Sequence, residues 1–574
     1  MIGLPAAFNA AGVLGFEPVK TSVLRVGAAI IAAAWLVDRL GRPPTVDVGA
    51  QPVVRAGIVL IALAGLSTAL SIEPALSFFG SFDRGMGWLS LAAGGVLLLS
   101  AADLFSDERR RERAITASLL GALIPCGYVL LQRIGLDPVT WTTLGAPGSS
   151  LGSPTFLGGY LVIVAPLAAY RVVSRAREAS FGYAGWLALL LVVCAVTILT
   201  TIRGPILGLA TGVVTFAILA RQRRRIGRLE VAGGLGVLVV GVALAISAMG
   251  ATGVVGMQRF LNIARSSDSS VERLTVWQDA LRIPIGDPLR MLIGFGPETQ
   301  QAVLERGEAT VRLTQNQQWD RAHNLLLDTW LTGGLVGVAA LIAVIGLAAT
   351  SAWRARATGG LLPAAVLAAV VGHLVEVTFA FHTVVTGALF WLLLGLAASL
   401  TPRSAPVGVA RRPRVATIGV IGALLLVPLL AAPAIADVMY GNARRADYLT
   451  GAQLEELAAQ WAPWVEELPR AAALDWQQVA AIRDDVLARA RAQADLREAA
   501  ARAPAEPLPQ LRLTRFYLAQ GDFRAAEQAC ERALANGPYR AAVWDMCADV
   551  SARQGLTDVA PVRRARAEDL RQPR

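Results

Sequence analysis

Residues 184–225 read AGWLALLLVVCAVTILTTIRGPILGLATGVVTFAILARQRRR. Two long apolar runs flank a short turn that holds Arg203, and a cluster of arginines follows the second run. Because a membrane-spanning helix needs about 20 predominantly apolar residues, each run predicts one span, at 184–201 and at 204–220. This stretch therefore predicts a helical hairpin across a lipid bilayer, with Arg203 at one surface and the arginine cluster at the other.

The whole chain has the same apolar character as this hairpin. Of its 574 residues, 55% are hydrophobic and 17% are charged, and the mean hydropathy is +0.52. Soluble globular proteins are usually ~45–50% apolar and ~25% charged, so the composition excludes an ordinary soluble chain. It also excludes a disordered chain. The formal net charge of +11 would by itself suit nucleic acid, but the spans indicate a lipid bilayer as partner, and we expect no nucleic acid.

Hydropathy predicts about twelve spans in the whole chain. They lie near 22–40, 54–71, 85–103, 114–132, 154–172, 184–201, 204–220, 230–249, 326–350, 361–381, 384–400 and 414–436. We therefore expect an all-α, polytopic membrane domain over residues 1–436. The first sixteen residues carry no basic region, so we expect no cleaved signal peptide.

The loops between the predicted spans alternate in charge. One set is rich in arginine and holds Arg39, Arg42, Arg109 to Arg111, Arg113, Arg171, Arg175, Arg177, Arg221, Arg223 to Arg225, Arg228, Arg354, Arg356, Arg403, Arg411, Arg412 and Arg414. The positive-inside rule places this set in the cytoplasm. The long loop 250–325 and the tail 437–574 are then predicted to lie on the extracytoplasmic side.

The tail differs in composition from the rest of the chain. It is rich in Ala, Arg, Glu and Gln, and its apolar residues recur at helical spacing. Gly521 and Gly555 lie 34 residues apart, which is the tetratricopeptide period. Residues 437–574 are thus predicted to be a helical, tetratricopeptide-like domain with a protein or peptide partner, or alternatively a plain helical cap. Its cysteines, Cys530 and Cys547, are either free or paired.

Short motifs are distributed along the predicted extracytoplasmic side. They are FFGSFDRGMG at 78–87, SPTFLGGYLVIVAPLA at 153–168, TIRGPILGL at 201–209, Arg273 with Trp277, Pro288, GFG at 294–296, His323–Asn324, and Gly334 with Gly337. In this order they resemble the O-antigen ligase and polymerase superfamily of bacterial membrane glycosyltransferases, over about residues 15–400. The sequence departs from the family at Ser153 and Thr155, where asparagine is usual, and at Ile202, where serine is usual.

The resemblance implies a helical bundle of the GT-C type and an enzyme of cell-surface polysaccharide assembly in the bacterial cytoplasmic membrane. Such enzymes transfer a glycan from a polyprenyl-diphosphate carrier, such as undecaprenyl diphosphate, to a hydroxyl of a glycan, lipid or protein acceptor. The resemblance implies inversion at the anomeric carbon without a metal. Because the sequence holds no Asp-x-Asp motif, we expect neither metal nor cofactor.

Three kinds of protein remain open besides the leading interpretation, an O-antigen ligase. A polysaccharide polymerase and a protein O-oligosaccharyltransferase would use the same leaving group, and a non-enzymatic scaffold or transporter is the alternative of a different class. Deletion of 437–574 is expected to leave an enzyme some basal transfer and to abolish the role of a scaffold.

Three arginines on the outer side are candidates for holding the donor diphosphate. Arginine binds phosphate oxygens bidentately and keeps its charge in an apolar place. Arg203 and Arg273 are predicted to be catalytic and Arg84 to bind substrate. Each has a plainer alternative. Arg203 can extend to the bilayer interface, Arg273 can pair with Glu272 or Asp279, and Arg84 can pair with Asp83.

Polar residues near the later spans complete the candidate site. His323 is the predicted general base for the acceptor hydroxyl, or a histidine satisfied by the start of a helix, and Asn324 is expected to orient it or to bind sugar. His373 and Glu376 are neighbours on one helical face. They are predicted to line the acceptor cavity, or else to hold two helices together by a mutual hydrogen bond. We expect His382 to contribute little to the site.

Overall fold

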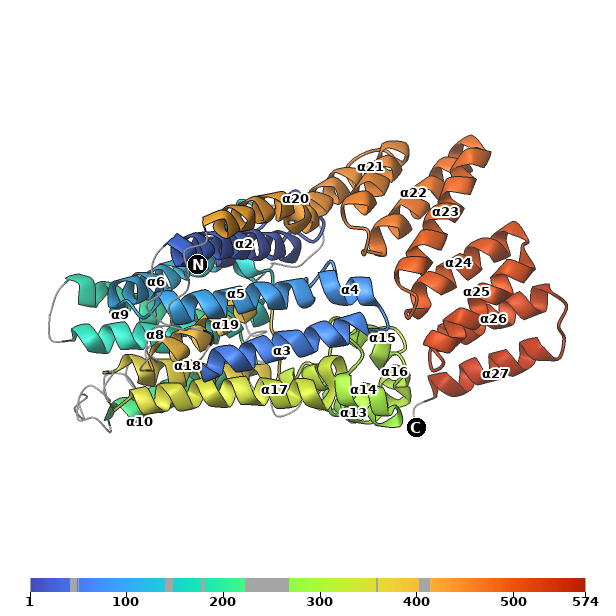
Figure 1. Cartoon of the computed structure of the whole chain (residues 1–574). Helices are drawn as coiled ribbons and strands as arrows, with labels where there is room; N and C mark the ends of the chain where they lie inside the picture. The colour runs from blue at the N-terminus through green and yellow to red at the C-terminus, as the bar shows by residue number, and fades with distance from the viewer. Residues whose placement is uncertain are drawn as a thin grey trace.

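The computed structural model describes residues 2–41, 49, 51–139, 148–176, 181–221, 268–357, 360–401 and 413–572. Regular structure in these residues is helical throughout, and they contain no strand. Long apolar helices form a bundle, and the polar helices of the C-terminal tail lie at one end of it (Figure 1). The expectation of an all-helical membrane protein is confirmed at this level.

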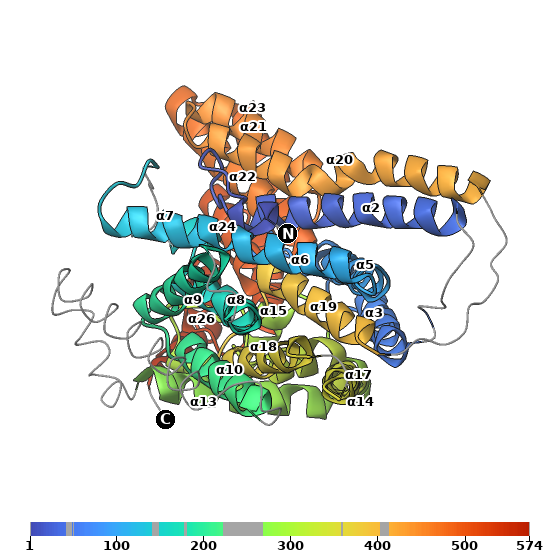
Figure 2. The ribbon, with the colours of Figure 1, turned by 90° about the vertical axis from the view of Figure 1, so that its left-hand side faces the viewer.

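The bundle consists of helices of 11 to 31 residues. They are α2 (Glu17–Gly41), α3 (Pro52–Ala69), α5 (Trp88–Leu104), α6 (Glu108–Gly121), α7 (Leu123–Arg133), α8 (Pro154–Arg175), α9 (Phe181–Leu199), α10 (Arg203–Arg221), α17 (Leu325–Ala355), α18 (Leu362–Val377), α19 (Val384–Ser399) and α20 (Pro413–Ala443). Figure 2 shows α2 and α20 side by side along one edge of this bundle.

The described residues do not confirm the predicted twelve spans. Among the described residues, eight helices are long and apolar enough to cross a membrane, with α6 and α7 counted as one. Three more apolar helices, α5, α18 and α19, are shorter. The span predicted at 230–249 lies outside the described residues.

Short elements gather at the end of the bundle that faces the tail. They are α4 (Pro74–Phe79), α13 (Asp268–Arg282), η4 (Ile283–Gly286), α14 (Pro288–Ile293), α15 (Gln300–Leu304) and α16 (Glu308–Leu313). Figure 1 shows α4 and α13 to α16 between the long helices and the tail. Two further short elements, α1 (Gly3–Ala6) and η2 (Ser149–Leu151), pack on α7.

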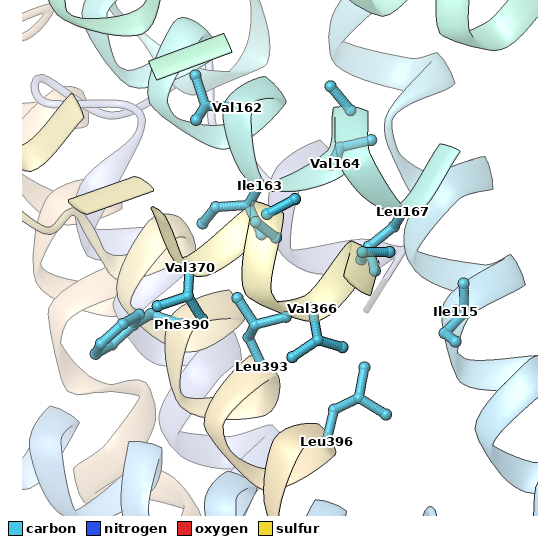
Figure 3. Packing of buried hydrophobic residues seen from close by; sticks show 14 of the residues in the cluster. Ile115, Val162, Ile163, Val164, Leu167, Val366, Val370, Phe390, Leu393 and Leu396 are labelled. Atoms are coloured by element: carbon cyan, nitrogen blue, oxygen red, sulfur yellow. The ribbon is translucent and has the colours of Figure 1, made fainter. Parts of the chain in front are cut away.

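The centre of the bundle is the packing of α8, α18 and α19. Figure 3 shows Ile163 of α8, Val366 and Val370 of α18, and Leu393 of α19 in one apolar cluster. Helix α10 crosses α18 without side chains between the two backbones, since a Cβ atom on Gly208 would lie 2.6 Å from the carbonyl oxygen of Gly372. Small residues allow such close contact between membrane helices. The crossing brings the first turn of α10 next to the last turn of α18.

The tail continues from α20 as a series of helices joined by short turns. They are α21 (Tyr448–Trp461), α22 (Glu467–Arg483), α23 (Val486–Arg502), α24 (Pro507–Gln520), α25 (Phe523–Asn536), α26 (Ala541–Arg553) and α27 (Val559–Arg571). Gly521 and Gly555 have φ of +75° and +77° just after α24 and α26. This left-handed conformation favours glycine, which accounts for the glycine spacing in the sequence. A disulfide joins Cys530 of α25 to Cys547 of α26.

Candidate functional site

A cavity of about 710 Å³ opens between α8, α10, α13 and the end of α18. Predicted site residues from five separate segments line it: Arg84, Arg203, Arg273, His323 and Glu376. The remaining two predicted residues do not line the cavity. Asn324 follows His323 in the chain, and His373 lies three residues before Glu376. The structure therefore brings most of the predicted residues into one place, although they are far apart in the sequence.

Arg84 stands on one wall of the cavity as part of an ion pair. Its Nη2 atom lies 2.7 Å from Oδ2 of Asp320, whereas the adjacent Asp83 is 3.7 Å from Nε. The rings of Phe156 and Phe381 lie within 6 Å of the guanidinium. Burial raises the pKa of Asp320, but the positive charges of Arg84 and Arg321 outweigh it and hold that pKa below its usual value. The pair is thus fully charged at neutral pH.

A buried arginine, Arg25, holds the turn that carries Arg84, and it was not predicted from the sequence. Arg25 of α2 is 2% exposed. Its Nε donates to Oγ of Ser90 at 2.9 Å, and its Nη2 donates to the carbonyl oxygen of Gly85 at 3.1 Å. A charged group at this depth requires such hydrogen bonds. Arg25 therefore fixes the backbone next to Arg84.

Arg203 and Arg273 approach the cavity from different helices. Arg203 is the exposed first residue of α10, and the backbone of α18 lies directly behind Gly204. Arg273 is half-buried on α13, and its Nη1 donates to the carbonyl oxygen of Phe379 at 3.4 Å. Burial, and then the positive charge of Arg203, lower the pKa of Arg273. The two guanidinium groups are thus close enough to repel each other, which favours an anion between them.

The plainer alternative for Arg273 does not apply within the described residues. Asp279 is buried and accepts a hydrogen bond from the backbone N–H of Thr310 at 2.7 Å instead. Glu272, the other acid considered, forms no ion pair with Arg273 in the part of the chain that the structure describes. Asp279 and Glu272 therefore leave the charge of Arg273 available to the cavity.

His323 faces the arginines with one ring nitrogen already engaged. Its Nδ1 lies 3.1 Å from the carbonyl oxygen of Arg321. Because a carbonyl oxygen only accepts, Nδ1 carries the hydrogen, and in the neutral ring Nε2 holds the lone pair. Burial lowers the pKa of His323, and the charge of Asp320 opposes this only in part. The imidazole is therefore neutral at pH 7, with a nitrogen ready to accept a proton.

The backbone at His323 is held in an uncommon conformation. Its φ is +55°, a left-handed value that non-glycine residues rarely adopt. The preceding Ala322 donates its N–H to Oδ1 of Asp328 and accepts from Nε1 of Trp277, both at 2.8 Å. Such conformations persist where the surroundings impose them, often at functional sites.

A second ion pair behind this loop was not foreseen from the sequence. Arg321, buried in front of Ala322, forms an ion pair with Glu298. Glu298 also accepts a hydrogen bond from Oγ of Ser81 at 2.6 Å. The pair thus ties the loop before α17 to the turn that carries Arg84. Its only signal in the sequence is the proximity of Arg321 to the His323–Asn324 motif.

The GFG motif at 294–296 serves the structure of this region. Gly294 and Gly296 both have positive φ. The backbone N–H groups of Phe295 and Gly296 donate to the carbonyl oxygens of Leu331 and Thr332 in α17. A Cβ atom on Gly294 would lie 2.3 Å from the backbone of Thr332, so only glycine fits. Helix α17 is non-helical at Gly334 in the same place. The motif therefore docks residues 294–296 onto a kink in α17.

Asn324 caps the helix that follows His323. Its Oδ1 accepts from the N–H groups of Leu326 and Leu327 at 3.0 and 3.2 Å, and its Nδ2 donates to the carbonyl oxygen of Thr378 at 3.2 Å. An asparagine at an N-cap satisfies backbone donors in this way. These bonds occupy both ends of the amide, so Asn324 supports the position of His323 through the backbone.

His373, Glu376 and His382 form a buried polar chain beside the cavity. Nδ1 of His373 lies 3.2 Å from Oε2 of Glu376, and its Nε2 lies 3.0 Å from Nε2 of His382. His373 is 0% and Glu376 2% exposed. Gly159 of α8 faces the carboxylate, and a Cβ atom there would lie 2.9 Å from Oε1. Of this pair only Glu376 lines the cavity. The approach of His373 to Glu376 lies within helix α18 and does not meet hydrogen-bond geometry, so the expected hydrogen bond between two helices is not found for these two side chains. His382 takes part although little was expected of it.

Comparison with known proteins adds information on the central part of the chain. Residues 186–342 match a family model described as O-Antigen ligase. The match includes Arg203, Arg273 and His323, whereas Arg84 and Glu376 lie outside it. No curated protein matches the chain. The segment that supplies three of the cavity's polar side chains is therefore similar to O-antigen ligases.

Proposed function

We propose that the protein is a membrane glycosyltransferase of the O-antigen ligase type. It would transfer a glycan from a polyprenyl-diphosphate-linked donor to an acceptor hydroxyl. The observation that carries this proposal is the convergence of Arg203, Arg273 and His323 in one cavity, within the segment that matches the ligase family.

The two arginines suit the diphosphate of such a donor. The leaving group is strongly anionic, and preorganised positive groups in an apolar place stabilise charge that develops on it. Arg203 and Arg273 each supply bidentate N–H donors for phosphate oxygens. Their positive charge makes a metal unnecessary in this proposal. Exposed Leu207, Leu274 and Phe379 beside them offer the prenyl chain an apolar route from the bilayer.

His323 supplies the base for the acceptor. Its Nε2 takes the proton of the acceptor hydroxyl while that oxygen forms a bond to the anomeric carbon, and the bond from this carbon to the diphosphate oxygen breaks. Attack from the face opposite the diphosphate inverts the configuration. The proton resides on His323, and the electron pair leaves with the diphosphate, whose charge the arginines balance.

The orientation and the tail fit this chemistry. With the arginine-rich loops in the cytoplasm, the cavity and the tail lie outside, in a multi-pass protein of the bacterial cytoplasmic membrane. The Cys530–Cys547 disulfide agrees, since disulfides persist in oxidising compartments. The tail would be a tetratricopeptide-like domain that binds a protein partner.

The test uses purified protein, a fluorescent lipid-linked oligosaccharide and acceptors of the three classes: glycan, lipid and protein. We expect His323→Ala to bind the donor as the wild type does, but to transfer it ~10²–10⁴-fold more slowly, the usual contribution of a general base. A single adduct indicates a ligase and a ladder indicates a polymerase. Transfer at the wild-type rate by His323→Ala would overturn the assignment of the base, and no transfer by the wild type to any acceptor would overturn the proposed function.

A further inference from the structure

Two segments bring polar side chains to the outer side of the cavity, and the tail contacts both. One segment, 73–84, carries Arg84, and the other, 298–323, carries Asp320 and His323. We propose that the tail is part of the transfer machinery, and that Arg540 is a positioning residue that holds the loop carrying Asp320 and His323 in its working geometry. This inference rests on the proposed function.

Arg540, at the start of α26, forms the central contact. It is 5% exposed, and its partner Glu305 is 3% exposed. Nε and Nη2 lie 2.8 and 2.5 Å from the two carboxylate oxygens of Glu305, and the guanidinium also donates to the carbonyl oxygens of Gln315 and Gln317 at 2.7 and 3.2 Å. Four acceptors on one buried cation make a contact that is costly to break from either side. Arg540 thus joins the end of α15 to the chain that leads to Asp320.

The same segment holds the tail in return. The side chain of Gln315 donates to the carbonyl oxygen of Tyr539 at 3.0 Å and accepts from the N–H of Ala541 at 2.9 Å. The guanidinium of Arg312 in α16 donates to Oδ2 of Asp569 in α27 at 2.9 Å and to the backbone carbonyl oxygen of Asp569 at 2.7 Å. The loop therefore has few degrees of freedom at Gln317, three residues before Asp320.

The second segment has its own contacts with the tail. Oε1 of Glu73 accepts from the N–H of Ala505 at 3.0 Å. The ring of Phe79 stacks on Trp464 with 4.0 Å between centroids. This segment ends in Arg84, which pairs with Asp320 of the other segment. A flexibly tethered module would not need contacts with both of the segments that this ion pair joins.

The strained backbone at His323 explains why positioning matters. A non-glycine residue at positive φ is held there by its surroundings, and His323 has φ of +55°. If the contacts at Gln315 and Gln317 loosen, the loop can relax and the ring leaves the position from which Nε2 reaches the acceptor. A misplacement of ~1 Å at a reacting group can reduce the rate about 10²-fold.

The experiment compares Arg540→Met with Arg564→Met in the full-length protein. Arg564 also forms an ion pair in the tail, but with Asp549 in solvent. We expect Arg540→Met to lower kcat at least ~10-fold with donor affinity unchanged, to shift the acid limb of the pH profile that His323 sets, and to speed hydrogen exchange in residues 318–323. Arg540→Lys should recover part of the rate, and Arg564→Met should match the wild type.

Gln315→Ala tests the same contact without leaving a buried charge, in case Arg540→Met fails to fold. It should lower kcat in the same direction by a smaller factor. Wild-type kcat in a folded Arg540→Met or Gln315→Ala protein would overturn the inference, while transfer by the wild-type protein to any of the acceptors tests the proposed function independently. Removal of residues 437–574 then no longer separates an enzyme from a scaffold, because both are expected to lose function.

Discussion

Asp320 forms an ion pair with Arg84 at the edge of the cavity, with 2.7 Å between Oδ2 and Nη2. The two residues are 236 positions apart, so the pair joins the turn before α5 to the loop before α17. The same carboxylate raises the pKa of His323 against the effect of burial. One acid therefore affects both the donor side and the acceptor side of the proposed reaction.

The pH dependence of transfer should report the pKa of His323. Only the neutral imidazole accepts a proton, so kcat/KM should rise with pH through this pKa and then remain level. Because burial lowers the pKa below 6.5, the acid limb should lie below pH 6.5. In Asp320→Asn the charge that raises this pKa is gone, and the limb should move to lower pH. Rates measured from about pH 5 to pH 8 would show both effects.

Asp83→Asn provides the control for this shift. Asp83 also lies near Arg84, at 3.7 Å, but in a more exposed place. Its loss should leave the acid limb where it is. An acid limb that lies above pH 6.5 in the wild type, or moves upward in Asp320→Asn, would contradict the role given to His323.

The arginine pair should act as a unit on the leaving group. We expect Arg203→Ala and Arg273→Ala each to lower kcat ~10²–10³-fold, the loss typical for one group that stabilises a developing anion. The double variant should lose less than the product of the two factors, since both groups serve one diphosphate. Arg203→Lys and Arg273→Lys should each recover part of the rate, because lysine keeps the positive charge but lacks the bidentate N–H donors of arginine.

Arg282→Ala is the matched control, because Arg282 is an exposed arginine on the same helix as Arg273. Single-turnover transfer with saturating donor measures these effects. Equal losses in Arg282→Ala and Arg273→Ala would indicate a general charge effect instead of a diphosphate site.

The apolar, all-helical character of the bundle could be predicted from the sequence, because apolar length and helical spacing are local properties. The hairpin of α9 and α10 with Arg203 in its turn is an example. The outer position of the polar motifs stays a prediction from the arginine distribution. The ion pairs Arg84–Asp320 and Arg321–Glu298 could not be predicted, since they depend on how distant segments pack. The contact of His382 with His373 depends in the same way on how the turn before α19 folds back on α18. The tail was predicted as a separate module, whereas its contacts with Glu305 and Gln315 had no signal in composition or spacing.

The disulfide should stabilise the tail measurably. Cys530 and Cys547 are 17 positions apart, and a loop of this size contributes about 3 kcal/mol in the chain-entropy description. The double serine variant should therefore lower the unfolding temperature of the tail. Non-reducing peptide mapping should recover the two cysteines in one linked peptide, with Cys126 and Cys194, which are free in the structure, unlinked. Free thiols at Cys530 and Cys547 in protein from the membrane would contradict the extracytoplasmic assignment.

Glu376 offers the last test, because its two interpretations differ in what they change. If Glu376 binds acceptor hydroxyls in the cavity, Glu376→Gln should raise the acceptor KM roughly 2- to 10-fold, as expected for one hydrogen bond, and leave donor affinity and thermal stability unchanged. If it serves only as the partner of His373, the same change should lower the unfolding temperature and leave KM unchanged. His373→Gln separates the cases further, since His373 does not line the cavity and should affect KM only through the position of Glu376. Its effect on KM should therefore be smaller than that of Glu376→Gln, and a larger one would contradict acceptor binding by Glu376.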